Sequence, residues 1–385
     1  MTVSDNNEWQ SPGGLPQPSP ESRPAPQWGE IAPGQWAPPP RPGLIPLHPL
    51  GLGDILGGAF RVLRRNPRPV VGAALVIRGI VAVLTIALMG LFTYYGLAGA
   101  IDATGSGYSQ LVIGQQVQSA ASSVFTAILG LVADAVLQGI VTLEVARGTL
   151  GEKLPLRELW ARARGRVGAL VGWSVLVGAV IIVAVLIVAG LIALLAITGG
   201  AAGVAFAVLL ALLFGAAAVA LFAWLGTRLL FVPSAILLER LPIRAAVVRS
   251  WTLTRGYFWR TLGIELLVSL IVSVASAIVL TPFTLILGII VAISVPASAA
   301  PNITASFPVF AATTAISALV SAITAIIAVS ATSLLYIDLR MRKEGLDLEL
   351  VRFVEARQTG TELPDPYLPL LSAPPTATTT ESPWG

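Results

Sequence analysis

Three polar residues inside long apolar stretches are the side chains most suited to chemistry in this sequence. Arg78 lies in the stretch 70–97, and Asp134 and Gln138 lie in the stretch 120–146. If both stretches are membrane helices, a rise of about 1.5 Å per residue places Arg78 and Asp134 at similar depths. A charge at mid-bilayer costs about 2.5–3.5 kcal/mol on insertion scales, so each should have a partner. We expect an Arg78–Asp134 contact with Gln138 nearby, either as a structural ion pair or as a proton or anion relay in which Asp134 titrates.

A second set of ionisable residues lies close to the expected ends of four apolar stretches. Its members are Glu144, Arg228, Glu265 and Asp338. Each is within about two helical turns of the same membrane boundary, at about 5.4 Å per turn. We expect these residues to form one inner ring. Two interpretations stay open: a ring of mixed charge that holds helix ends together, or a gate or polar headgroup site.

The composition excludes several kinds of reactive centre. The chain has no cysteine and a single histidine, His48. It therefore has no disulfide, no thiolate nucleophile, no cysteine-bound metal and no histidine cluster for a metal or for acid–base chemistry. We expect no catalytic residue, no metal and no cofactor.

The balance of apolar and charged residues indicates a membrane protein. Of 385 residues, 55% are hydrophobic and 11% are charged, with a mean hydropathy of +0.82. A soluble domain of this length cannot bury so many apolar side chains, so the chain should cross a membrane several times. All of the 24 Lys and Arg except Arg78 fall in or beside segments assigned to the cytoplasm. This positive-inside distribution explains the basic charge without a nucleic-acid partner.

Three basic amphipathic segments, here called elbows, precede apolar stretches. Their apolar stripes begin at Leu52, Leu156 and Ile243 and recur at helical spacing, with Arg164 interrupting the second stripe. Such helices lie on a membrane surface, where arginine side chains reach lipid phosphates. The arginines expected to contact anionic headgroups are Arg61, Arg64, Arg65, Arg244, Arg249, Arg255 and Arg260.

Six apolar stretches are long enough to cross a hydrocarbon core of about 30 Å. They are predicted at about residues 70–97, 120–146, 167–197, 201–231, 261–294 and 309–337. The loops 98–119 and 295–308 contain no Lys or Arg, so both termini should be cytoplasmic in a bacterial plasma membrane. The predicted fold is an all-α integral membrane protein with three hairpins, each preceded by an elbow. Pro282 leaves open a kink or a re-entrant turn in the fifth span.

The two ends of the chain differ from its apolar centre. Residues 1–43, rich in Pro, Gly, Gln and Ser, are predicted to be a disordered cytoplasmic tail. This tail is either a docking arm for a protein with an aromatic groove or a solvated leader. Residues 344–357 are predicted to form a cytoplasmic surface helix, and 358–385 a second disordered tail. The sequence favours no oligomeric state.

Three segments carry a resemblance to a known family. They are RPGLIPLHPLGLGDILGGAFRVLRRNP at 41–67, FVPSAILLERLPIRAAVVRSWTLTRGYFWRTLGIELL at 231–267 and LLYIDLRMRKEGLDLEL at 334–350. Over about residues 41–357 the chain resembles actinobacterial multi-pass membrane proteins that are similar to the membrane domain of glycerophosphoryl diester phosphodiesterase. In some members this domain is fused to a soluble barrel whose chemistry needs paired histidines and carboxylates around a metal. Because His48 is the only histidine in the sequence, the resemblance implies the membrane architecture for this chain but no catalytic residue.

These patterns predict a non-enzymatic, polytopic plasma-membrane protein. We expect a lipid-gripping scaffold or accessory membrane domain whose elbows hold anionic lipids. The alternative is a small transporter or lipid-handling permease that uses Arg78 and Asp134.

Overall fold

The computed structural model describes residues 43–102, 107–198, 200–294, 303–361 and 363–368. The tail predicted at 1–43 therefore lies outside the described residues except for Gly43, as does the C-terminal stretch 369–385. Regular structure in the described part is entirely helical. The helices are α1 (Leu52–Arg65), α2 (Pro67–Asp102), α3 (Gly107–Thr149), α4 (Leu156–Thr198), α5 (Gly200–Leu229), α6 (Val232–Leu238), α7 (Ile243–Thr254), α8 (Phe258–Ser294), α9 (Ile303–Glu344) and α10 (Leu346–Gln358).

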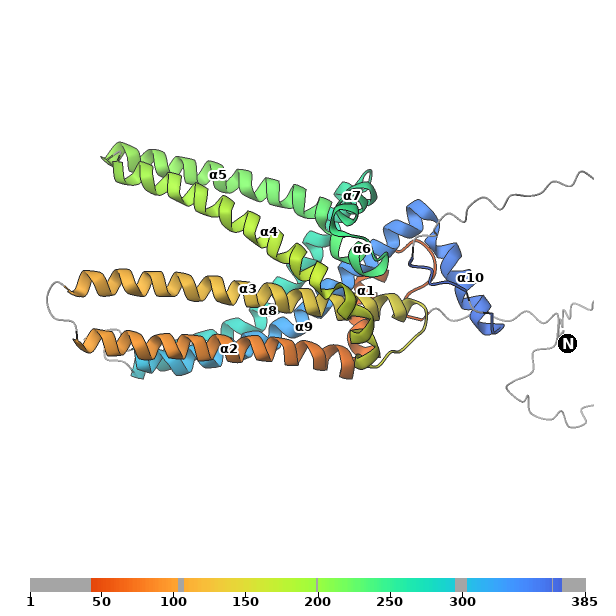
Figure 1. Cartoon of the computed structure of the whole chain (residues 1–385), viewed down its shortest axis with the longest axis horizontal. Helices are drawn as coiled ribbons and strands as arrows, with labels where there is room; N and C mark the ends of the chain where they lie inside the picture. Colours follow the sequence, from red (N-terminus) through yellow and green to blue (C-terminus); the bar gives the residue numbers. More distant parts are fainter. Residues whose placement is uncertain (1–42, 103–106, 199, 295–302, 362, 369–385) are drawn as a thin grey trace, which may run out of the picture. The chain divides into compact units, whose positions relative to one another are not determined.

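Six of these helices, α2, α3, α4, α5, α8 and α9, are long and apolar enough to cross a membrane. They pack as three hairpins, α2 with α3, α4 with α5 and α8 with α9 (Figure 1). The predicted all-α fold with six spans is confirmed. The helices run further than expected, because α2 and α3 extend into the loop predicted at 98–119.

The fifth span is one continuous helix. α8 runs from Phe258 to Ser294 with Pro282 inside it. A proline removes one helical hydrogen bond, and a membrane helix tolerates this loss when neighbouring groups satisfy the freed carbonyl. α8 therefore contains no re-entrant turn.

Two elbows are separate helices and the second is not. Pro67 starts α2 directly after Asn66, and Gly256, with φ of +88°, separates α7 from α8. Proline suits a first helical position and glycine suits a left-handed turn. Gly165 and Gly168, beside Arg166, have no positive φ, and the segment at 156–167 continues into the third span as the single helix α4. The expectation of a separate elbow there is wrong.

The apolar stripes of α1 and α7 pack partly against the protein itself and are not wholly exposed. α1 buries Ile55, Ala59 and Val62, and Gly58 lies against Leu334 of α9. α7 buries residues on one face as well, namely Ala246, Ser250, Leu253 and Thr254. The arginines of both helices are thereby placed at the edges of a packed interface.

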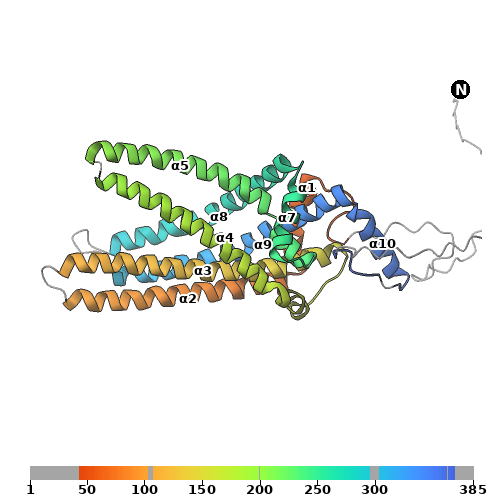
Figure 2. The same cartoon turned by 45° about the horizontal axis from the view of Figure 1, so that its top comes forward.

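α9 is the central helix of the fold. It contacts α1, α2, α3, α7, α8 and α10. The elbows α1 and α7 lie with α6 and α10 at one end of the long helices, which we call the polar end (Figure 2). Here α6, which the sequence did not reveal as a separate helix, is buried along its whole length. Away from this end, α4, α5 and α8 expose large apolar side chains, as surfaces that contact lipid do.

Part of the stretch 358–385, predicted to be disordered, has a defined structure. α10 ends at Gln358, and the chain then packs back onto the protein, so that Tyr367 is buried. The prediction of disorder is wrong for the described residues up to Leu368.

The entry into α1 is tightly packed at Gly43. A Cβ on Gly43 would lie 2.5 Å from the nitrogen and 2.6 Å from the Cα of Gly151, both backbone atoms of the turn after α3. Gly43→Ala should therefore displace this segment, lowering the free energy of unfolding by about 1–3 kcal/mol, typical of overpacking. The thermal midpoint in detergent measures this effect. Gly53→Ala is the control, because no atom lies within 4 Å of its Cβ position and alanine favours the helix; an equal midpoint for both variants would contradict the packing argument.

Candidate functional site

Arg78 of α2 and Asp134 of α3 form an ion pair within the spans. The Arg78 side chain is 18% exposed and the Asp134 side chain 52% exposed. Gln138 lies one turn further along α3 and is half-buried. The predicted contact is therefore present, and the pair neutralises two charges that would each be costly in the membrane.

The four residues expected to form one inner ring have different partners. Glu144 accepts a hydrogen bond from Asn66 at 3.2 Å, and Arg228 donates to Thr254 at 3.4 Å. Glu265 accepts from Thr332 at 3.5 Å, whereas Asp338 binds two arginines. The prediction of a single ring is wrong, because each of the four residues binds a partner outside this set.

Asp338 is the centre of a buried cluster that we call the Asp338 node. Its carboxylate lies 3.0 Å from Nη1 of Arg260 and 2.9 Å from Nε of Arg342, and it accepts a hydrogen bond of 2.7 Å from the Leu50 backbone N–H. The Leu50 carbonyl accepts a further hydrogen bond of 2.8 Å from each arginine. Two cations and one anion leave a net charge of +1. The node joins the entry to α1 with α8 and α9.

A second cluster lies around Glu239, just after α6. Arg249 of α7 binds Glu239 at 2.8 Å and Glu344 at 2.5 Å, and Arg340 binds Glu344 at 3.1 Å. Tyr336 donates a hydrogen bond to Glu239. Burial lowers the pKa of Arg249, but the hydrogen bonds and charges of Glu344 and Glu239 outweigh it and raise this pKa above its ordinary value. Arg249 therefore stays charged and links α6, α7 and α9.

The seven arginines predicted at lipid headgroups fall into two groups. Arg65, Arg249 and Arg260 have protein partners, which the prediction did not include; Arg65 donates to the backbone carbonyls of Gly148 at 2.5 Å and Glu152 at 3.2 Å. Burial lowers the pKa of Arg65, and the charge of Glu144 opposes this. The other four, Arg61, Arg64, Arg244 and Arg255, are exposed at the polar end, and Arg61 also donates to the Gly57 carbonyl of its own helix at 3.2 Å. Contact of these arginines with lipid stays a prediction.

The segment after α10 is held by an anchor that sequence reasoning missed. The Tyr367 hydroxyl hydrogen-bonds with Thr149, and Arg340 donates to the Tyr367 carbonyl at 3.0 Å. Asp365 forms an ion pair with Arg147. The available signal was an acidic residue and an aromatic residue, Asp365 and Tyr367, in an otherwise Pro- and Thr-rich stretch. Within the described residues, no group of three or more His, Asp or Glu side chains is placed to hold a metal ion.

The Tyr367 anchor should loosen in alkali. Burial raises the pKa of Tyr367 above its ordinary value of about 10, although the hydrogen bond with Thr149 opposes this. A raised pKa means that the docked state disfavours the phenolate, so docking is fully stable below about pH 10 and weakens as the pH rises further. A spin label on Leu363→Cys, in this cysteine-free chain, should become more mobile above that pH.

The same label in a Tyr367→Phe background is the control, because phenylalanine keeps the packing and removes the titrating hydroxyl. The rise in label mobility should then disappear. A rise that persists in Tyr367→Phe would show that another group causes the loosening.

Comparison with known proteins supports the membrane architecture. No curated protein and no solved structure matches the chain. One region of the chain matches a family model. This region contains two of the three segments that carry the resemblance, 231–267 and 334–350, whereas the segment 41–67 lies outside it. Residues 204–362, which run from α5 to just beyond α10, match the family model of the membrane domain of glycerophosphoryl diester phosphodiesterase, and this part of the chain is similar to that domain.

Proposed function

We propose that this protein is a non-enzymatic accessory membrane domain that binds anionic lipids at the cytoplasmic face of a bacterial plasma membrane. The observation that carries the proposal is a group of four exposed arginines on and beside the elbows α1 and α7, at the polar end. These are Arg61 and Arg64 on α1, and Arg244 and Arg255 at the two ends of α7. Guanidinium groups bind phosphates in bidentate geometry, and each basic residue near an anionic surface contributes about 1 kcal/mol.

The distribution of charge supports the proposed orientation. Three stretches of the sequence around the far ends of the long helices, 98–119, 198–202 and 295–308, contain no Lys or Arg. Lys and Arg concentrate on the cytoplasmic side of bacterial membrane proteins. The polar end is then cytoplasmic, and its arginines face the leaflet rich in anionic lipid.

The non-enzymatic role is supported by what the matching region represents and by the residues present. The match covers a membrane domain. The resemblance implies that the barrel fused to this domain in some members needs paired histidines. This chain contains only His48. These observations support a role in binding lipid and holding partners at the membrane.

Replacing the four exposed arginines with glutamine should release anionic lipid. The purified variant, Arg61→Gln, Arg64→Gln, Arg244→Gln and Arg255→Gln together, should carry less phosphatidylglycerol than the wild type by at least about tenfold, since the lost attraction is about 1 kcal/mol per charge. Mass spectrometry of lipids that remain after purification measures this. The same four positions changed to lysine form the control, which keeps the charge; equal retention by the glutamine variant and the wild type would refute the proposal.

A second candidate function, proton-coupled transport, is favoured by the presence of an ionisable pair, Arg78 and Asp134, inside two candidate spans. Asp134 is paired with Arg78 inside the spans, and ionisable pairs at membrane depth are features of proton relays. In proteoliposomes, Asp134→Asn should then abolish proton-linked flux.

The double variant Arg78→Leu with Asp134→Leu separates the transport role from a structural one. Replacing both members of an ion pair with apolar residues preserves or raises stability in many proteins, whereas transport would be lost. Flux that survives in the stable double variant, or is absent from the wild type, would exclude the transport role.

A further inference from the structure

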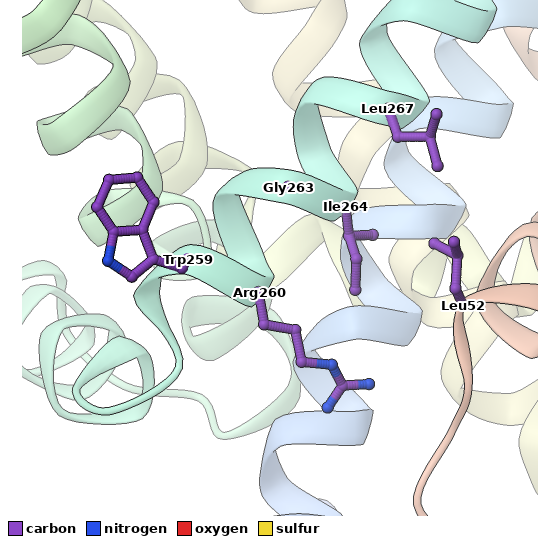
Figure 3. A pocket seen from close by; sticks show the side chains of 6 residues that line it. All are labelled: Leu52, Trp259, Arg260, Gly263, Ile264 and Leu267. Atoms are coloured by element: carbon purple, nitrogen blue, oxygen red, sulfur yellow. The ribbon is translucent and has the colours of Figure 1, made fainter.

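A groove opens beside the Asp338 node, between the start of α1 and the first turns of α8 (Figure 3). Its volume is about 290 Å³. It is lined by Leu52, Trp259, Arg260, Gly263, Ile264 and Leu267. Figure 3 shows Leu52, Ile264 and Leu267 pointing toward one space, with Arg260 near the start of α8.

The wall of the groove is apolar and its floor is open. Leu52 is 44% exposed, and no atom lies within 4 Å of the Cβ position of Gly263. The groove lies at the beginning of a span, and the neighbouring Leu266 and Leu270 are exposed on α8. In a membrane, exposed apolar surface at this depth contacts acyl chains.

The mouth of the groove carries positive charge. Arg260 belongs to the Asp338 node, which has a net charge of +1, and its side chain is 28% exposed. A guanidinium has five N–H donors, and the ion pair with Asp338 and the hydrogen bond to the Leu50 carbonyl leave others available. Arg260 can therefore donate to a phosphate oxygen without leaving the node. Trp259, 80% exposed, suits the headgroup level beside it.

We propose that this groove binds one phospholipid of the membrane, with an acyl chain along Gly263 and Leu267 and the phosphate at Arg260. The inference rests on the proposed orientation and deepens the proposed function, because it assigns one defined lipid site in place of general attraction to an anionic surface. Charge complementarity at the mouth and an apolar wall below it select a phosphate-bearing lipid.

Filling the groove tests this site. Gly263→Leu places a side chain in the groove and leaves Arg260 in the node. Native mass spectrometry of protein released from nanodiscs of phosphatidylglycerol and phosphatidylcholine should show one retained phospholipid for the wild type, with about tenfold lower occupancy for Gly263→Leu, equivalent to about 1.4 kcal/mol. Diacylglycerol with the same acyl chains, which lacks the phosphate, should not displace the lipid from the wild type.

Gly288→Leu is the matched control, since Gly288 is also on α8 with no atom within 4 Å of its Cβ position. It should retain the lipid. A second pair of variants tests the site if Gly263→Leu does not fold. Leu52→Gln, in the wall of the groove, should lose the lipid. Phe60→Gln should keep it, because Phe60 is 43% exposed on the same helix but does not line the groove. Retention in both groove variants, or equal loss in both controls, would overturn the site.

The outcomes distinguish this site from the proposed function. The four-arginine glutamine variant should lose general enrichment of anionic lipid and keep the single phospholipid, because Arg260 is unchanged. Gly263→Leu should keep the general enrichment of anionic lipid and lose the single phospholipid. If the four arginines prove neutral while Gly263→Leu still loses one lipid, the proposed function fails and the groove stands.

Discussion

Asp338 places a carboxylate where no solvent reaches it, at the point where α9 meets α8 and the entry to α1. An unpaired charge in such a place costs several kcal/mol, so the surrounding donors must be fixed in position. Arg260, Arg342 and the backbone of Leu50 meet this requirement together. The positions of α1 and α8 at the polar end follow from it, and so does the groove between them.

The two ends of the long helices are held by different forces. At the polar end, α9 buries charged clusters and also small residues such as Ala331 and Ser333, which allow helices to approach closely. Ser333 donates a hydrogen bond to Thr142 of α3 at 3.1 Å. Further away, α4, α5 and α8 are largely apolar on their exposed faces, where lipid provides the contacts that protein does not.

The sequence was sufficient to predict those features that depend only on how deep a residue lies in the membrane. Long apolar runs located the six spans, and counting residues from the boundary paired Arg78 with Asp134. It was not sufficient at the helix ends. Arg260 and Asp338 are far apart in the chain, and Arg249 reaches Glu239 only because α6 turns back toward α7. Hydropathy does not encode such turns, so the single ring and the separate second elbow were wrong predictions.

The Leu50 contacts also constrain the order of biogenesis. The backbone N–H and carbonyl of Leu50 find their partners 210 to 292 residues later in the chain. At about 5–20 residues per second, the ribosome needs on the order of tens of seconds to supply Asp338 after Leu50 has emerged. During that interval α1 has no α9 to pack on. The packing of α1 is therefore completed only when the last hairpin, α8 with α9, has been inserted.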